Sequence, residues 1–338
     1  MDTLFTNAKL LDIMFQIARP LFLTCETPLH AGSGDALGIV DLPIQRERHT
    51  SFPKIEASSL KGALREAFEE KYISSNPKRD HPNIFKLFGP EDGDLNAGAL
   101  GFTDARLLLF PVKSLKGVFA WITCPKALRQ FSEDLKLAKL QAIEGTISAT
   151  DKKAAPFSDL NSLAFGEYFV LEEYTFEKAP SPALKIGKKD LEKWLADNLF
   201  DPGSYWHDKA QKDILILSDS DFRDFVNLST EVITRIKINN ETGTVQQGAL
   251  FTEEYLPAES VLYSLVLASP EFLTSIQVNE RDERGEKKHR RPEKADAVIK
   301  LFADNLNTII QLGGNATLGK GILRTKLLSP SNSDSDEG

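Results

Sequence analysis

One early segment, residues 30–50, contains many of the side chains that could do chemistry. It reads HAGSGDALGIVDLPIQRERHT and mixes glycines with carboxylates, histidines and arginines. No apolar period long enough for a helix runs through it, so we expect a loop. Asp41 is its most informative carboxylate, because it follows an apolar pair and precedes several basic side chains. A carboxylate near phosphate-binding cations can act as a general base or recruit a divalent metal.

The basic side chains that follow Asp41 are Arg46, Arg48 and His49. They could position a phosphate backbone. A structural turn or a salt bridge is the simpler interpretation of Asp41. His30, at the start of the segment, could serve as an acid–base group or stack on an RNA base. A lone histidine in a loop more often does neither.

Two glycine-rich stretches resemble nucleotide-binding motifs but lack the context of those motifs. GSGDALG at 32–38 has the wrong spacing for a dinucleotide fingerprint, and no helix follows it. GNATLGKG at 314–321 lacks the Ser or Thr that a P-loop needs after Lys320, and it runs from a helix to a strand. Backbone N–H groups at Gly319 and Gly321 could still approach phosphates, with Lys320 adding charge. The alternative is a tight turn before a closing strand.

The stretch SSLKGALREAFEEKY at 58–72 has apolar residues at helical spacing and predicts an amphipathic helix. Lys61 and Arg65 are i, i+4 neighbours on its polar face, in the half of the helix that also attracts anions. A phosphate chain could bind there. The alternative is an ordinary solvated face on which Arg65 pairs with Glu69.

The composition is that of an acidic globular protein. Its 338 residues are 41% apolar, which is enough for one large domain or two modest ones. The formal charge of −8 argues only weakly against nucleic acid, because binding depends on where cations cluster. Cys25 and Cys124 lie far apart and match neither a metal site nor a disulfide framework, so we expect a reducing cytoplasm. We find no secretory signal and no apolar run that predicts a membrane span.

We expect a single domain over 14–328, an N-terminal extension at 1–13 and a disordered acidic tail at 329–338. A second Met at position 14 leaves two interpretations of residues 1–13, a helical extension or an upstream start codon. Short strands alternate with helices and long insertions, which favours an α+β sheet domain of ferredoxin type. Ser58 or Ser59 is the expected N-cap of the first helix. The expected strands are 21–27, 52–57, 99–112, 118–124, 168–176, 231–239, 244–251, 260–268 and 322–328, the expected helices are 58–72, 125–140 and 294–312, and the expected polar or charged loops are 145–163 and 279–291.

The run TPLHAGSGDALGIVDLPIQRERHTSFPKIEASSLKGALRE at 27–66, together with GGNATLGKGILR at 313–324, closely resembles one family. It is the RAMP-superfamily backbone subunit of type III-B (Cmr) CRISPR effector complexes, the fourth Cmr subunit. The resemblance covers the chain from Met14 to about residue 328. It implies a modified ferredoxin-like (RRM-like) palm with a thumb β-hairpin, here at about 231–259, and an inserted finger region. It also implies that copies stack head to tail along a CRISPR RNA (crRNA), together with other Cmr subunits.

The resemblance further implies an activity. Each thumb would interrupt the duplex of guide and target RNA and displace a nucleotide, and each copy would cut the target RNA at that gap. The catalytic aspartate of the family falls on Asp41, within GIVD at 38–41. Cutting would proceed by attack of the neighbouring 2′-hydroxyl and would need a divalent metal, Mg²⁺ or Mn²⁺, with Asp41 as its ligand. Base displacement would supply the in-line alignment that this attack requires.

The resemblance also suggests which other residues would meet RNA. The possible neighbours of the scissile site are Glu253, Glu254 and Tyr255. The expected RNA contacts are His30, Arg46, Arg48, His49, Ser59, Lys61, Arg65, Gly319, Lys320 and Gly321. The charged loop at 279–291 is a mobile surface loop in the simplest interpretation and an RNA contact in the second.

Two alternative functions remain open from the sequence. The chain could be a non-catalytic crRNA-binding scaffold, in which Asp41 is structural and another subunit cuts. It could also be a guide-processing nuclease of the same superfamily, which should cut repeat RNA alone, without metal and with a histidine. The presence of only His30 and His49 near the motif makes that third function less attractive.

Overall fold

The computed structural model describes residues 15–34, 40–73, 81–90, 97–239, 241–272 and 291–328. The expected extension at 1–13, the expected tail at 329–338 and residues 279–290 of the expected charged loop lie outside this part of the chain. Among the described residues, no helix has the length and apolar character needed to cross a membrane.

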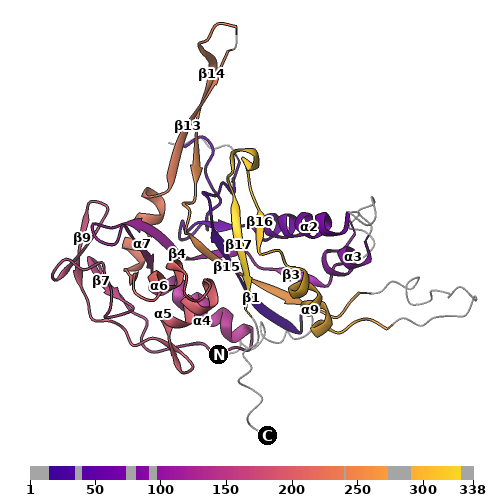
Figure 1. Cartoon of the computed structure of the whole chain (residues 1–338), viewed down its shortest axis with the longest axis horizontal. Coiled ribbons are helices and arrows are strands. Elements are labelled where there is room, and N and C mark those ends of the chain that lie inside the picture. Colours follow the sequence, from indigo (N-terminus) through magenta and orange to yellow (C-terminus); the bar gives the residue numbers. More distant parts are fainter. Residues whose placement is uncertain are drawn as a thin grey trace, which may run out of the picture.

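The centre of the fold is formed by four antiparallel strands and two crossover helices (Figure 1). The strands lie in the order β17-β1-β15-β4, and the helices connect β1 to β4 and β15 to β17. A β-α-β-β-α-β chain with this order is the ferredoxin-like arrangement, so the predicted α+β palm is confirmed. The elements are β1 (Ile17–Cys25), α2 (Ala57–Ile73), β4 (Ala105–Lys113), β15 (Val261–Ala268), α9 (Ala295–Asn305) and β17 (Ile322–Leu327).

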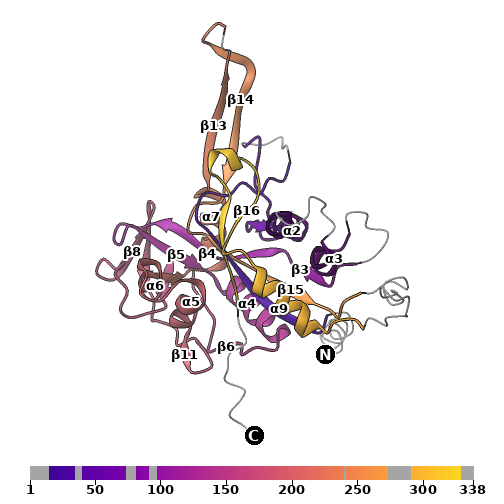
Figure 2. The same ribbon diagram turned by 45° about the vertical axis from the view of Figure 1, so that its right-hand side comes forward.

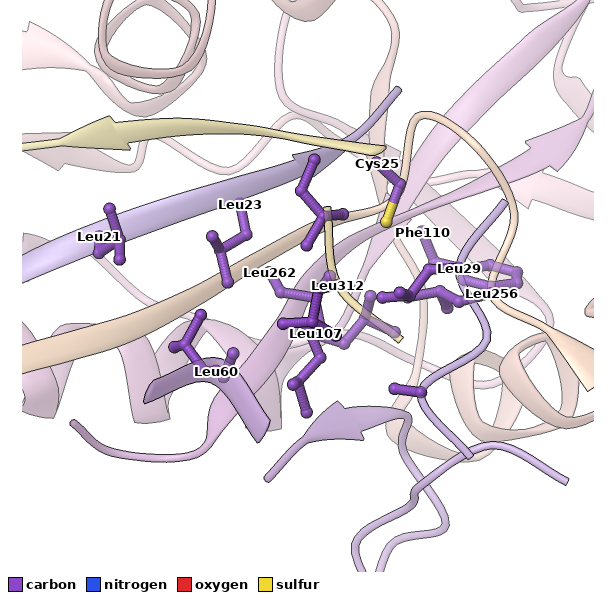
Figure 3. Packing of buried hydrophobic residues seen from close by; sticks show 14 of the residues in the cluster. Leu21, Leu23, Cys25, Leu29, Leu60, Leu107, Phe110, Leu256, Leu262 and Leu312 are labelled. Atoms are coloured by element: carbon purple, nitrogen blue, oxygen red, sulfur yellow. The ribbon is translucent and has the colours of Figure 1, made fainter. Parts of the chain in front are cut away.

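Both faces of this sheet are covered, which explains why β1 reads as a continuous apolar run. Leu21 and Leu23 belong to one buried cluster, which includes Leu60 of α2 and Leu262 of β15 (Figure 3). Phe22, which points to the opposite face, belongs to a second cluster built with α4 (Pro125–Leu137). Two-sided burial leaves no polar face along β1.

A long insertion between β4 and β15 extends the sheet in the order β5-β12-β7-β9-β8. Its elements besides α4 are β5 (Phe119–Thr123), β6 (Ile143–Glu144), β7 (Lys153–Pro156), β8 (Tyr168–Leu171), β9 (Tyr174–Lys178), β10 (Lys185–Ile186), β11 (Lys189–Asp190), α5 (Leu191–Leu199), α6 (Tyr205–Ala210), β12 (Ile214–Ile216) and α7 (Asp219–Leu228). The remaining short elements are β2 (Lys54–Ile55), α3 (Pro82–Phe88), β3 (Leu100–Phe102), β16 (Ile309–Gln311) and the 3₁₀ turn η1 (Ala316–Leu318).

The same insertion ends in a separate two-stranded hairpin, which we call the thumb. It consists of β13 (Glu231–Ile238) and β14 (Val245–Tyr255), which pair only with each other among the described strands. The hairpin stands out from the rest of the protein in both views (Figures 1 and 2). The hairpin predicted from 231–239 and 244–251 is confirmed.

Two predicted elements are wrong. The helix expected over 294–312 ends at Asn305, because Leu306 adopts extended backbone and the β-branched residues that follow form β16 against β17. The single strand expected over 168–176 is the hairpin of β8 and β9. Its turn passes through Glu172, which has a φ of 49°. The connection between α9 and β16 and the turn between β8 and β9 both lack the Gly or Pro that usually indicates a turn in a sequence.

Tertiary contacts also shift the boundaries of other elements. Helix α2 begins at Ala57, so Ser58 and Ser59 lie inside its first turn and neither is the N-cap. The N–H of Ala57 donates instead to the Asp104 carboxylate, 47 residues further along the chain. Asp104 also divides the strand expected over 99–112 into β3 and β4, and the loop expected over 145–163 contains β7.

The glycine loop between β16 and β17 is a closed turn. The N–H groups of Gly319, Lys320 and Gly321 donate to the carbonyls of Ala316, Asn315 and Pro28, respectively. These N–H groups are therefore not free to bind a phosphate, which corrects the expected role of the two glycine backbones and leaves the Lys320 side chain for that role.

Gly321 and Gly319 test this structural interpretation as a pair. Both have positive φ, but a Cβ at Gly321 would lie 2.0 Å from the Leu312 carbonyl oxygen, whereas a Cβ at Gly319 meets nothing within 4 Å. We expect Gly321→Ala to cost roughly 3 kcal/mol of stability and Gly319→Ala about 1 kcal/mol. Thermal denaturation of the two variants measures the difference, and equal losses would contradict a steric role for Gly321.

Candidate functional site at the foot of the thumb

Asp41 is attached directly to the thumb. The Asp41 Oδ2 atom accepts hydrogen bonds from the N–H of Thr252 at 2.7 Å and from its hydroxyl at 2.9 Å. The Thr252 hydroxyl in turn accepts from the Asp41 N–H at 3.0 Å. The side chain of Asp41 is nevertheless exposed. The structure therefore presents a solvent-facing carboxylate in a fixed orientation at the foot of the hairpin.

The backbone around Asp41 is held in the same way. The N–H of Leu42 donates to the carbonyl of Thr252, and the N–H of Glu254 donates to the carbonyl of Leu42. These bonds add a short parallel strand contact to the edge of β14. Asp41 is therefore tied to the thumb by backbone as well as by side-chain bonds.

The electrostatics of Asp41 favour its charged form. Hydrogen bonds from the Thr252 N–H and hydroxyl lower the pKa of the Asp41 carboxyl below its ordinary value. Because the side chain is open to water, the negative charge remains available to a cation or to a proton of a ligand.

Glu254 is a buried anchor rather than a group that faces the site. Its Oε1 accepts from the Arg46 guanidinium at 2.5 Å and from the Thr230 hydroxyl at 2.8 Å, and its Oε2 accepts from the N–H of Ile44 at 3.0 Å. Arg46 also donates to the carbonyls of Ser51 and Val226. The expectation that Arg46 positions RNA is therefore corrected, because its donors are used inside the protein.

Glu253 and Tyr255 lie on the opposite face of β14, because successive side chains of a strand alternate. The Tyr255 hydroxyl donates to Glu253 Oε2 at 2.5 Å. Arg235 of β13 donates to both side chains, and so does the amide of Asn315 from the glycine loop. Lys320 Nζ lies 5.0 Å from the centre of the Tyr255 ring. This buried network connects the thumb to the glycine loop and faces away from Asp41.

His30 belongs to this buried network. Its Nδ1 lies 2.7 Å from the carbonyl oxygen of Glu254 and therefore donates to it, and its ring packs against Tyr255. A Cβ at Gly32 would lie 2.7 Å from the His30 Nε2 atom. With its ring covered in this way, His30 is not placed to stack on a base, and a packing role replaces the expected one.

The remaining expected RNA contacts separate into free and engaged side chains. Arg48 and His49 are exposed on a turn, where the His49 Nε2 atom lies 3.8 Å from the Glu47 carboxylate, and Lys61 is half-buried with no hydrogen bond among the described residues. Burial and the nearby Arg65 charge lower the pKa of Lys61. Arg65 itself pairs with Glu69 at 2.6 Å, the pair that the alternative interpretation predicted, although the two side chains are largely buried rather than solvated. Arg65 also donates to the carbonyl of Gly89.

The thumb carries an exposed apolar stripe on the face that carries the Thr252 side chain. Across the hairpin Thr234 pairs with Thr252, and the next pair on the same face is Ile236 with Leu250. Those two side chains are 53% and 65% exposed. Val232, Ile238 and Val245 are about half exposed as well. Exposed aliphatic side chains beside a carboxylate suit contact with an uncharged, flat partner such as a nucleobase.

Asp41 could hold a divalent metal only with help from a ligand. No group of three His, Cys, Asp or Glu side chains that could enclose a metal exists among the described residues. Mg²⁺ commonly binds through one or two carboxylates together with water and substrate phosphates. A single oriented, exposed carboxylate fits that mode and does not fit a closed protein site.

Sequence reasoning missed Thr252, Arg235 and Asn315. Asn315 has a φ of 64°, and asparagine after two glycines is a sequence signal for such a left-handed turn. Thr252 and Arg235 carry no local signal. Their importance depends on the register of the hairpin and on which residues lie across from them.

Arg46 and Arg48 provide a test of the buried anchor. Arg46→Ala leaves the Glu254 carboxylate buried without its cation, so we expect a loss of roughly 3–5 kcal/mol of stability. Arg48→Ala removes an exposed side chain and should change stability by less than about 0.5 kcal/mol. Denaturant unfolding of both variants checks this. Similar stability of the Arg46 variant and the wild type would exclude the anchor.

The chain matches one family model and two curated relatives over most of its length. The model of the RAMP superfamily matches residues 22–324. The CRISPR system Cmr endoribonuclease Cmr4 of Pyrococcus furiosus is 38% identical over 312 residues, covering 90% of this chain and 94% of that protein. The CRISPR system CMR subunit Cmr4 of Saccharolobus solfataricus is 27% identical over 339 residues, covering 93% of this chain and 98% of that protein.

Solved structures agree with these sequence matches. The crystal structure of oligomeric Cmr4 from Pyrococcus furiosus is 30% identical with a TM-score of 0.63, and the match covers 93% of this chain and 99% of that one. A chain of the apo type III-B Cmr-beta structure, determined by cryo-EM, is 24% identical with a TM-score of 0.66. The match covers 94% of this chain and 99% of that one, and it supports the fold. The chain therefore belongs to the RAMP superfamily and, within it, to the Cmr4 family.

Proposed function

We propose that this chain is a cytoplasmic backbone subunit of a type III-B CRISPR effector complex, which binds crRNA as a head-to-tail filament and cuts complementary target RNA. The observation that carries the proposal is the exposed carboxylate of Asp41, held at the foot of a projecting hairpin in a chain of the Cmr4 family. The Pyrococcus relative is named an endoribonuclease, and its crystal structure is described as oligomeric. Both descriptions support the proposed activity and self-association.

Asp41 is the proposed catalytic group. The 2′-oxygen attacks the adjacent phosphorus as the bond to the 5′-oxygen breaks, which leaves a 2′,3′-cyclic phosphate. The 2′-hydroxyl proton passes to a base or to water, and the departing 5′-oxygen takes up a proton from water. The Asp41 carboxylate is ionised near neutral pH, as an aspartate with an ordinary or lowered pKa is, so it can accept a hydrogen bond or hold a cation next to the phosphate. Mg²⁺ or Mn²⁺ bound by Asp41 and the RNA would neutralise charge on the phosphate.

The thumb has the shape and surface to separate bases. A two-stranded hairpin that projects from the fold can enter between paired nucleotides. The exposed Ile236 and Leu250, which follow the Thr234–Thr252 pair along the thumb, can cover a displaced base without competing for its hydrogen bonds. Displacement beside Asp41 would place the reacting phosphate and the carboxylate together.

Accessible basic side chains are the proposed contacts of the guide RNA backbone. Lys61 lies in the N-terminal half of α2, and Lys320 lies over Tyr255 beside the thumb. Arg48 and His49 are exposed on the turn after Asp41. Sequence specificity would come from base pairing with the guide rather than from these cations.

The first experiment compares Asp41→Ala and Asp41→Asn with wild type in the reconstituted complex. We expect wild type to cut target RNA into a regularly spaced ladder and both variants to bind target but cut at least about a hundredfold more slowly. Removal of divalent metal with EDTA should stop wild-type cleavage. An unchanged ladder from the Asp41 variants would instead support the alternative of a non-catalytic crRNA-binding scaffold.

A second experiment tests the guide-binding role of Lys61. Lys61→Gln should weaken binding of crRNA by the full chain and reduce the slope of log affinity against log salt by about 0.7, the effect of one phosphate contact on a single strand. Lys300→Gln is the matched control, because Lys300 lies on α9 and pairs with Asp304 at 2.6 Å. Equal salt slopes for both variants would remove Lys61 from the RNA interface.

A further inference from the structure

Thr252 and Asp41 form a closed ring of hydrogen bonds. The Thr252 hydroxyl accepts from the Asp41 N–H at 3.0 Å and donates to Asp41 Oδ2 at 2.9 Å, while the Thr252 N–H donates to the same oxygen at 2.7 Å. Oδ2 therefore has two donors from one residue. Oδ1 has no hydrogen-bond partner among the described residues, and the side chain is open to solvent.

We infer that Thr252 is a positioning residue, whose hydroxyl fixes the Asp41 carboxylate so that only Oδ1 is presented to the RNA. This inference rests on the proposed function, since it concerns how Asp41 acts. Thr252 touches neither the proposed substrate nor the reacting atoms, and its effect passes through Asp41.

The hydroxyl matters because the one other donor to the Asp41 carboxylate among the described residues is the N–H of Thr252. An exposed aspartate side chain rotates freely about its two torsions, and only a fraction of its orientations would point an oxygen at the phosphate. Two bonds to Oδ2 remove that freedom before RNA binds, which lowers the entropic cost of reaching a reactive geometry. No second side chain donates to the Asp41 carboxylate in the described part of the chain.

The position of Thr252 on β14 couples the carboxylate to the thumb. The carbonyl of Thr252 accepts from the N–H of Leu42, so Thr252 holds both the side chain of Asp41 and the backbone next to it. The hairpin that would displace a base therefore carries Asp41 with it. The distance from the displaced nucleotide to the carboxylate is then fixed by the strand itself rather than by a separate loop.

The test uses three single variants in the reconstituted complex. Thr252→Val keeps the β-branched shape and the backbone N–H but loses the hydroxyl. Thr252→Ser keeps the hydroxyl. Thr234→Val is the matched control, because Thr234 lies directly opposite Thr252 on the same face of the hairpin, is exposed and has no bond to Asp41.

We expect Thr252→Val to cut target RNA about tenfold more slowly in single-turnover assays, the effect of one hydrogen bond to a charged group. Thr252→Ser and Thr234→Val should cut at close to the wild-type rate. Target affinity and melting temperature should be the same for all three. Recovery by serine is the decisive result, because a general weakening of the hairpin would not follow the hydroxyl.

Asp41→Asn, assayed in parallel, distinguishes failure of the positioning role of Thr252 from failure of the proposed catalytic role of Asp41. If Asp41→Asn abolishes cutting while Thr252→Val cuts at the wild-type rate, the positioning role is overturned and the proposed function stands. If Thr252→Val and Thr252→Ser are equally slow, the hydroxyl is not the cause and the inference also fails. If Asp41→Asn cuts normally, Asp41 is not catalytic, so both the proposed function and the positioning role of Thr252 are wrong.

Discussion

The buried carboxylate of Glu254 is the interaction on which the architecture of the site depends. It accepts from Arg46, from the Thr230 hydroxyl at the start of the thumb and from the backbone of Ile44. A buried carboxylate without partners is costly, so these three donors must converge on it when the protein folds. Their convergence places the segment after Asp41 against the start of β13 and the end of β14.

This anchor explains how an isolated hairpin can be part of a functional site. Two strands without a third, or without a packed face, are marginally stable in water. Here the base of the hairpin is held on both faces, by Glu254 on one and by the network of Glu253, Tyr255 and Asn315 on the other. The outer part of the hairpin can then remain exposed and apolar, because the contacts at its base hold the two strands in place.

Several basic residues of the motif region do not face the candidate site, because they stabilise the fold instead. Arg46, Arg65 and His30 are basic side chains in the motif region, and each is bound inside the protein. The residues that remain accessible are fewer: the Asp41 carboxylate, the Lys61 and Lys320 amines, and the Arg48–His49 turn. A phosphate chain would therefore meet a small set of cations on a net acidic protein, which is enough because affinity depends on local charge.

The sequence by itself determined the palm, the thumb hairpin, the family and the position of Asp41. Strong apolar runs such as β1, helical spacing in α2 and a long family motif are local signals, and local signals survive in a single sequence. The start of α2 and the end of α9 differ from the expected boundaries because the Asp104 contact and the pairing of β16 with β17 lie outside any short window of residues. The roles of side chains were decided only by the tertiary structure. Whether Arg46 faces RNA or Glu254 depends on a partner 208 residues away, and Thr252 gains its role only from its register opposite Asp41.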